Sequence, residues 1–186
     1  AATVEVAGEA EKFLFYRGVG SFDQPLSVRI TGAGEARAFE LENRGAEPIG
    51  TVLLFENVDG EAAFAEVGEL APLAVRRLRR DAFVFSRELS LAPLEELLRA
   101  HGLFADEARA MLATWRRDWF EPGLRAFHVL PRPATDRLLP LTLVPAPRAL
   151  ERVLVGRLEL FEPGFEQEFL AAARAVSTGE RSAEQA

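Results

Sequence analysis

Apolar and polar residues alternate along two stretches in the first half of the chain, residues 26–31 and 36–41. A period of two is typical of a strand with one buried face. Gly32-Ala33-Gly34 separates the two stretches and supplies residues that favour a tight turn. The pattern therefore predicts an antiparallel β-hairpin over residues 26–41.

Two other stretches are apolar on both faces, Phe13-Leu14-Phe15-Tyr16 and Val52-Leu53-Leu54-Phe55. Such runs are typical of strands that are covered on both sides. We expect the first run to form a central strand. The second run is followed by the turn residues Asn57-Val58-Asp59-Gly60 and then by Ala63-Phe64-Ala65-Glu66-Val67, which predicts a second hairpin.

After residue 89 the apolar residues recur at the spacing of a helix. Leu94, Leu97 and Leu98 share one face of a short predicted helix, which Ser90 caps and which ends at His101-Gly102. In a second, longer helix the apolar residues recur every three or four positions. They are Ala108, Met111, Leu112, Trp115 and Trp119. We expect both tryptophans to pack between this helix and the sheet.

Beyond Pro122-Gly123 the pattern returns to strands, which we expect over residues 126–130, 138–144 and 153–160. Prolines are frequent in this region, and a proline cannot donate a hydrogen bond to a neighbouring strand. The middle strand is therefore expected to lie at a sheet edge or to start after Pro140.

Together these elements predict one α+β domain over residues 11–176. Its sheet is mainly antiparallel, either a single sheet or a β-sandwich, and it carries an inserted helical hairpin. A C-terminal helix follows, indicated by the spacing of Phe165, Phe169, Leu170 and Ala173. Residues 1–10 and 177–186 are mostly small or polar, so we expect both ends to be flexible.

Composition narrows the classes of function. The chain has 186 residues, a net charge of -7 and no cysteine, which excludes disulfides, thiolate metal sites and cysteine nucleophiles. The negative charge and the lack of a basic stripe argue against a nucleic-acid partner. No stretch is apolar enough to span a bilayer or to act as a signal peptide. Because the sequence begins Ala1-Ala2-Thr3, we expect it to be a processed or excised piece of a longer protein.

The sequence contains no strong catalytic, metal-binding or cofactor-binding motif. The two histidines, His101 and His128, belong to no metal-binding pattern, and we expect structural roles for both. We accordingly predict no cofactor and no metal. The weak candidates for a hydrolytic site are Asp118 and Glu121, which lie beside aromatic residues, together with His128. A solvated helix end is the plainer interpretation of the two carboxylates.

Arginine is concentrated at one place, where Arg76, Arg77, Arg79 and Arg80 lie within five residues of sequence. Such a cluster is a candidate binding surface for an anionic partner. The alternative is a solvated turn that leads into a strand at Phe83-Val84-Phe85. These four arginines are the binding residues that the sequence predicts.

Four segments carry a resemblance to a known family. They are Glu11-Lys12-Phe13-Leu14-Phe15-Tyr16-Arg17-Gly18, Thr114-Trp115-Arg116-x-x-Trp119-Phe120-Glu121, Leu139-Pro140-Leu141-Thr142 and Val155-Gly156-Arg157-Leu158-Glu159-Leu160. In order and spacing, the chain resembles a family of uncharacterised exported bacterial proteins. The resemblance implies a periplasmic or extracellular location. It transfers no activity and no functional residue.

The leading hypothesis is therefore a non-enzymatic interaction or structural domain of a bacterial envelope protein, whose partner is a protein or another envelope component. One alternative is a hydrolase that acts on an envelope polymer. Another is a small-ligand-binding module with its pocket between the sheet and the helical hairpin.

Overall fold

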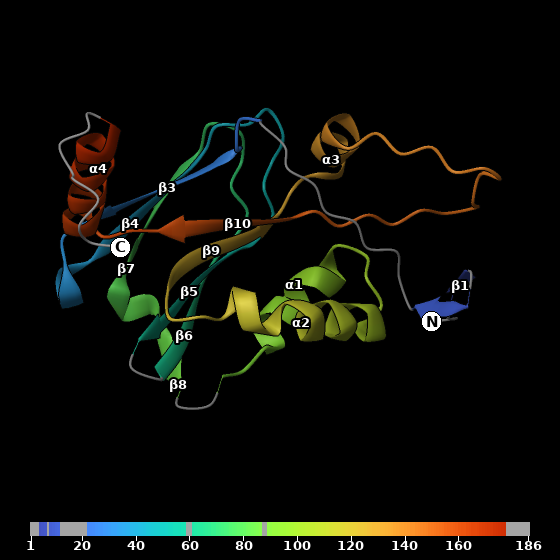
Figure 1. Cartoon of the computed structure of the whole chain (residues 1–186), viewed down its shortest axis with the longest axis horizontal. Coiled ribbons are helices and arrows are strands. Elements are labelled where there is room, and N and C mark those ends of the chain that lie inside the picture. The colour runs from blue at the N-terminus through green and yellow to red at the C-terminus, as the bar shows by residue number, and fades with distance from the viewer. Residues whose placement is uncertain (1–3, 7, 12–21, 59–60, 87–88, 178–186) are drawn as a thin grey trace.

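Antiparallel strands form the framework of the computed structural model, which describes residues 4–6, 8–11, 22–58, 61–86 and 89–177 (Figure 1). One sheet has the strand order β3-β4-β7, and a second has the order β10-β9-β5-β6-β8. The first comprises β3 (Leu26–Thr31), β4 (Ala38–Asn43) and β7 (Val75–Arg79). The second comprises β5 (Val52–Val58), β6 (Glu61–Val67), β8 (Val84–Ser86), β9 (Gly123–Val129) and β10 (Val155–Leu160). Among the described residues, the strands β1 (Val4–Val6) and β2 (Glu9–Glu11) form a separate two-stranded sheet.

Helices connect or follow the strands of the larger sheet. They are α1 (Ala92–Ala100), α2 (Ala105–Trp119), α3 (Arg132–Leu138) and α4 (Pro163–Ser177). The structure also contains two short 3-10 helices, η1 (Gly34–Ala36) and η2 (Arg80–Ala82). The α+β class, the antiparallel pairing, the helical hairpin α1–α2 and the C-terminal helix are all confirmed. Both predicted β-hairpins are also confirmed, as β3–β4 and β5–β6.

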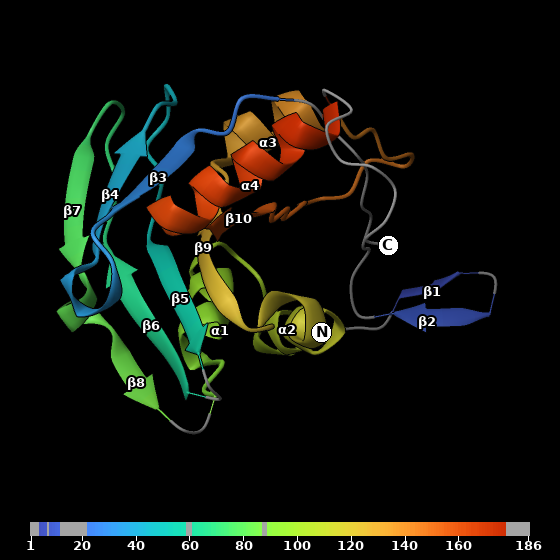
Figure 2. The ribbon, with the colours of Figure 1, turned by 60° about the vertical axis from the view of Figure 1, so that its left-hand side comes forward.

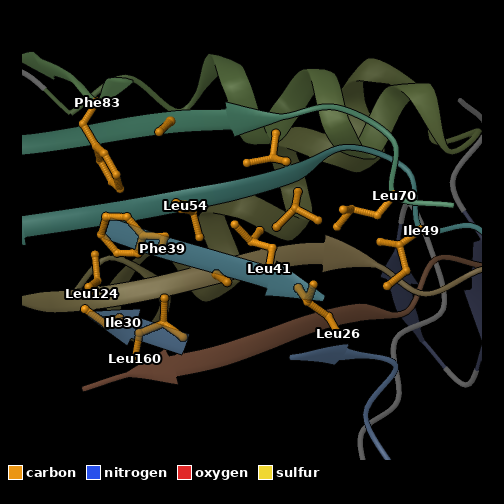
Figure 3. Packing of buried hydrophobic residues seen from close by; sticks show 14 of the residues in the cluster. Leu26, Ile30, Phe39, Leu41, Ile49, Leu54, Leu70, Phe83, Leu124 and Leu160 are labelled. Atoms are coloured by element: carbon orange, nitrogen blue, oxygen red, sulfur yellow. The ribbon is translucent and has the colours of Figure 1, made fainter. Parts of the chain in front are cut away.

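The two faces of the larger sheet carry separate hydrophobic clusters. Leu54 of β5 packs with Phe39 and Leu41 of β4, so this cluster joins the two sheets (Figure 3). The neighbouring residue Phe55 points to the opposite face and packs with residues of α1 and α2 such as Leu94. Figure 2 shows the three-stranded sheet on one side of β5 and the helical pair on the other. An apolar run on β5 is therefore required, because both faces of this strand are covered.

The longer amphipathic helix is confirmed as α2. Trp119 is buried and lies 5.6 Å, centroid to centroid, from Phe127 of β9. Trp115 is half-buried and stacks on Trp119 at 6.1 Å. Both tryptophans pack against the sheet, as predicted. The preceding helix α1 starts at Ala92 with Leu91 in the N-cap position, one residue after the predicted cap. Ser90 nevertheless accepts a hydrogen bond through its Oγ from the N–H of Ala92, at 3.4 Å.

Two other predictions are corrected by the structure. Residues 138–144 do not form a strand, because the chain is helical through Leu138 and then irregular as far as Leu154. Pro133 lies in the first turn of α3, where its missing N–H costs nothing. The arginine cluster is also not a turn, because three of its members lie in β7. The strand expected at Phe13-Leu14-Phe15-Tyr16 lies outside the described residues.

Gly156 is required by a close approach between two strands. It lies opposite His128 in the β9–β10 pair, and the imidazole ring occupies the space above it. A Cβ atom at Gly156 would lie 2.2 Å from Cε1 of His128. A side chain at this position is therefore incompatible with the buried ring.

Replacing Gly156 with alanine should lower the free energy of unfolding by about 2 to 3 kcal/mol, because the added methyl group overpacks a rigid ring. Urea denaturation followed by circular dichroism measures this change. Gly68→Ala is the matched control, since nothing lies within 4 Å of a Cβ built there, and it should be close to neutral. Equal stability of the two variants would contradict this explanation.

Candidate functional site

The four arginines predicted as a binding cluster do not gather on one surface. Arg76, Arg77 and Arg79 lie on β7 with exposed side chains, while Arg80 begins η2 and is turned largely inward. Successive residues of a strand point to opposite faces, so Arg76 and Arg77 are directed apart. Arg77 also forms a cross-strand ion pair with Glu40 of β4 at 2.7 Å. The outer face of this sheet is therefore of mixed charge.

Arg80 belongs to a buried ion cluster that the sequence analysis missed. Glu56 of β5 is fully buried and pairs with Arg37, and its other oxygen lies 3.5 Å from Nε of Arg80. Arg80 also pairs with Glu35 at 2.6 Å, and Arg37 with Glu162 at 3.2 Å. The cluster thus connects the larger sheet to both 3-10 helices and to the segment before α4. The available sequence signal was one carboxylate directly after the apolar run of β5.

His128 is buried with no hydrogen-bond partner for either ring nitrogen among the described residues. Burial lowers its pKa to about 4, because the low-dielectric interior disfavours the charged ring. A buried neutral histidine packed on Gly156 fits the structural role expected from the sequence. The other histidine, His101, packs against Gly50, and burial lowers its pKa as well.

The weak hydrolytic candidates are not brought together. Asp118 lies near the end of α2 and Glu121 lies in the turn before β9, both with exposed side chains. His128 lies near the far end of β9, about 16 Å along the strand from its start. No group of three or more histidine, aspartate or glutamate side chains in the described part of the chain could hold a metal ion.

The largest accumulation of exposed apolar side chains follows β10. Phe161, Phe165 and Phe169 have 50%, 53% and 60% of their surface exposed, and Leu170 and Val176 are also exposed. The ring of Phe161 stacks with that of Phe165 at 5.2 Å and with that of Phe169 at 6.5 Å. None of the α4 side chains that the structure describes is buried. We call this surface, defined by Phe161, Phe165 and Phe169, the aromatic face of α4.

A groove of about 780 Å³ lies beside the first half of β3. Its floor and walls include Leu26 and Val28 of β3, Leu130, and Leu158 of β10. Helix α3 and the loop that follows β4 close its other sides. We call this the β3 groove. A smaller hollow of about 410 Å³ lies at the turn between α1 and α2.

Comparison with family models, with curated proteins and with solved structures finds no match. Within the described residues, no helix is both long enough and apolar enough to cross a bilayer. The candidate sites are therefore inferred from the geometry of this structure alone.

Replacing Glu56 with glutamine should lower the free energy of unfolding by about 3 kcal/mol or more, because Arg37 and Arg80 would keep their charge in the interior without a carboxylate partner. The exposed pair provides the control, and Glu40→Gln should cost less than about 1 kcal/mol. Chemical denaturation of both variants tests this difference. A cost for Glu56→Gln no larger than that of Glu40→Gln would show that the buried pair is dispensable.

Stability should fall as the pH drops below about 6.5, the ordinary pKa of histidine, and the contribution of His128 should level off below its folded-state pKa of about 4. Between these values the unfolded chain binds the proton and the folded chain does not, so folding is penalised by up to about 3 kcal/mol. Denaturation of the wild type and of His128→Leu from pH 4 to 8 isolates this contribution. Parallel pH profiles for the two proteins would contradict it.

Proposed function

We propose that this chain is a non-enzymatic interaction domain of an exported bacterial envelope protein, and that the aromatic face of α4 binds a partner protein. The observation that carries this proposal is the row of stacked, half-exposed phenylalanines formed by Phe161, just before α4, and by Phe165 and Phe169 on α4. Contiguous apolar patches of this kind are uncommon on monomeric proteins and mark interaction sites. The envelope location in the proposal comes from the sequence resemblance.

The energetics of α4 support an external partner. A 15-residue helix is marginal in water by itself, and most helical stability in proteins comes from packing an apolar face. Only Pro163, Ala172 and Ala175 of the described α4 side chains are even half-buried. Most of the apolar surface of α4 is therefore available to another molecule. Phenylalanine offers a large contact area, which makes such a row an effective binding surface.

The charges beside the aromatic face favour a protein over a membrane surface. Glu162 and Glu168 border the phenylalanines, and Glu168 is exposed. Anionic lipids would be repelled by the exposed carboxylate of Glu168, whereas the charge of Glu162 is met by Arg37. Peripheral membrane helices usually carry lysine and arginine on their polar side. We infer a partner protein that presents an apolar surface with basic residues at its margin.

The hydrolase alternative has less support. Asp118 and Glu121 lie at one end of β9 and His128 lies buried toward the other, so no single cleft contains all three. A general acid or base must reach the proton that it transfers, either directly or through one water molecule.

The double substitution Phe165→Gln and Phe169→Gln should weaken binding of the partner at least tenfold while leaving the free energy of unfolding within about 0.5 kcal/mol of the wild type. Exposed side chains contribute little to folding, whereas aromatic residues at the centre of an interface dominate its affinity. The partner is first identified by cross-linking the domain in envelope extract and by mass spectrometry. The dissociation constants are then measured with purified partner.

The matched control is Val84→Gln on β8, another strongly exposed apolar residue, which should bind normally. A loss of stability above about 2 kcal/mol in the double variant would mean that the phenylalanines serve the fold. Unchanged affinity of the double variant for the purified partner would exclude the aromatic face as the binding surface.

A further inference from the structure

We propose that the aromatic face of α4 binds a second copy of this chain, through the proline-rich loop that connects α3 to β10. We call this loop, residues 140–149, the arm. The assignment rests on the proposed function, since the binding surface is the same, and it adds the identity of the partner. The arm and the aromatic face match each other in apolar character and in charge.

The arm projects from the body of the molecule instead of packing on it. Figure 1 shows the loop between α3 and β10 extending away from both sheets. Leu143 is half-buried, and the other residues of the arm are exposed. No residue of the arm forms a hydrogen bond or an ion pair with another residue in the described part of the chain. The surface of the arm is therefore available to a second molecule.

Two arginines fix the ends of the arm to α3. Arg132 donates hydrogen bonds to Asp136 and to the carbonyl of Leu150, each at 2.7 Å. Arg152 donates to Asp136 at 2.7 Å and also to the carbonyl of Leu139. Hydrogen bonds from both guanidinium groups lower the pKa of the Asp136 carboxyl group. Because its two ends are held, the arm leaves the body in a defined direction and loses less entropy when it binds.

The exposed surface of the arm is apolar and conformationally restricted. Leu141 and Val144 are 42% and 92% exposed, and three prolines lie beside them, Pro140, Pro145 and Pro147. Proline fixes the backbone angle φ, so the segment has few conformations to lose on binding. Extended proline-rich segments commonly dock on surfaces that are lined by aromatic side chains. An exposed aromatic surface is therefore the partner that the arm fits.

The aromatic face of α4 has this chemistry, and its charge complements that of the arm. Phe165 and Phe169 present rings that stack on Phe161 and stay more than half exposed. Glu168 is exposed beside them, and Arg148 is exposed in the arm. Neither of these charged residues pairs with another residue that the structure describes. Opposite charges at the margin of an interface favour one orientation of the partners.

The arm of one molecule lies too far from its own aromatic face to bind it. In Figure 1 the arm and α4 lie at opposite ends of the longest axis of the molecule. A contact between these two surfaces therefore joins two copies. Two antiparallel copies related by a two-fold axis place each arm beside the aromatic face of the other, so a closed dimer contains the contact twice.

Self-association of the purified full chain is measured by sedimentation velocity over a range of concentrations, and the wild type should shift from monomer to dimer. Two double variants, Leu141→Ser with Val144→Ser in the arm and Phe165→Gln with Phe169→Gln on α4, should each weaken dimerisation about tenfold or more. All four side chains are substantially exposed, so both variants should stay folded. The matched control is Val84→Gln on β8, which should dimerise like the wild type.

A mixture of the two double variants tests which surfaces meet. The arm variant keeps an intact aromatic face and the α4 variant keeps an intact arm, so the mixture retains one of the two contacts. Heterodimers should form at concentrations at which each variant alone is monomeric. Mixing would not repair a defect in folding, so this recovery distinguishes a binding role of the two surfaces from a structural one.

A wild type that stays monomeric at its highest soluble concentration would overturn the proposal, as would dimers that resist both double variants. Dimers that are lost in the α4 variant but not in the arm variant would also overturn it, because two aromatic faces would then pair directly. In the first case the proposed function still stands if the α4 variant loses a different envelope protein. That function fails separately, when the α4 variant keeps full affinity for the partner that is cross-linked in the extract.

Discussion

The carboxylate of Glu56 is the group on which the arrangement of the two sheets and α4 depends. A charge with no exposed surface is tolerated only where opposite charges meet it, and Arg37 and Arg80 reach Glu56 from the segments that frame the smaller sheet. Through Glu162, Arg37 also contacts the segment that leads into α4. The cluster therefore fixes how the sheets meet and where α4 starts. Apolar contacts alone would leave the two sheets and α4 freer to shift relative to one another.

Two surface features lie beside β10, the aromatic face of α4 and the β3 groove. The aromatic face begins directly after this strand, and Leu158 of β10 lies in the wall of the β3 groove. Figure 2 shows α4 running across this side of the molecule, close to β3 and β10.

Strands and helices with a strong period were predictable from the sequence. The hairpins β3–β4 and β5–β6 and the helix α2 have the spacing of their type, and each places its apolar residues in a core cluster. The strand β7 was missed because three of its five residues are arginines, so its pairing with β4 depends on cross-strand partners such as Glu40. The helix α3 was missed because its seven residues include Pro133 and are too few to show a helical period.

The sequence by itself determined the class of the fold, the absence of cysteine chemistry and the apolar character of α4, because period and composition are local properties of a chain. The tertiary structure decided which apolar residues stay exposed and which arginines turn inward to Glu56. Those properties depend on contacts between segments far apart in sequence. Phe127 and Phe169 are the same residue type in apolar stretches, yet one is buried beneath α2 and the other is 60% exposed, since only the folded chain covers the first.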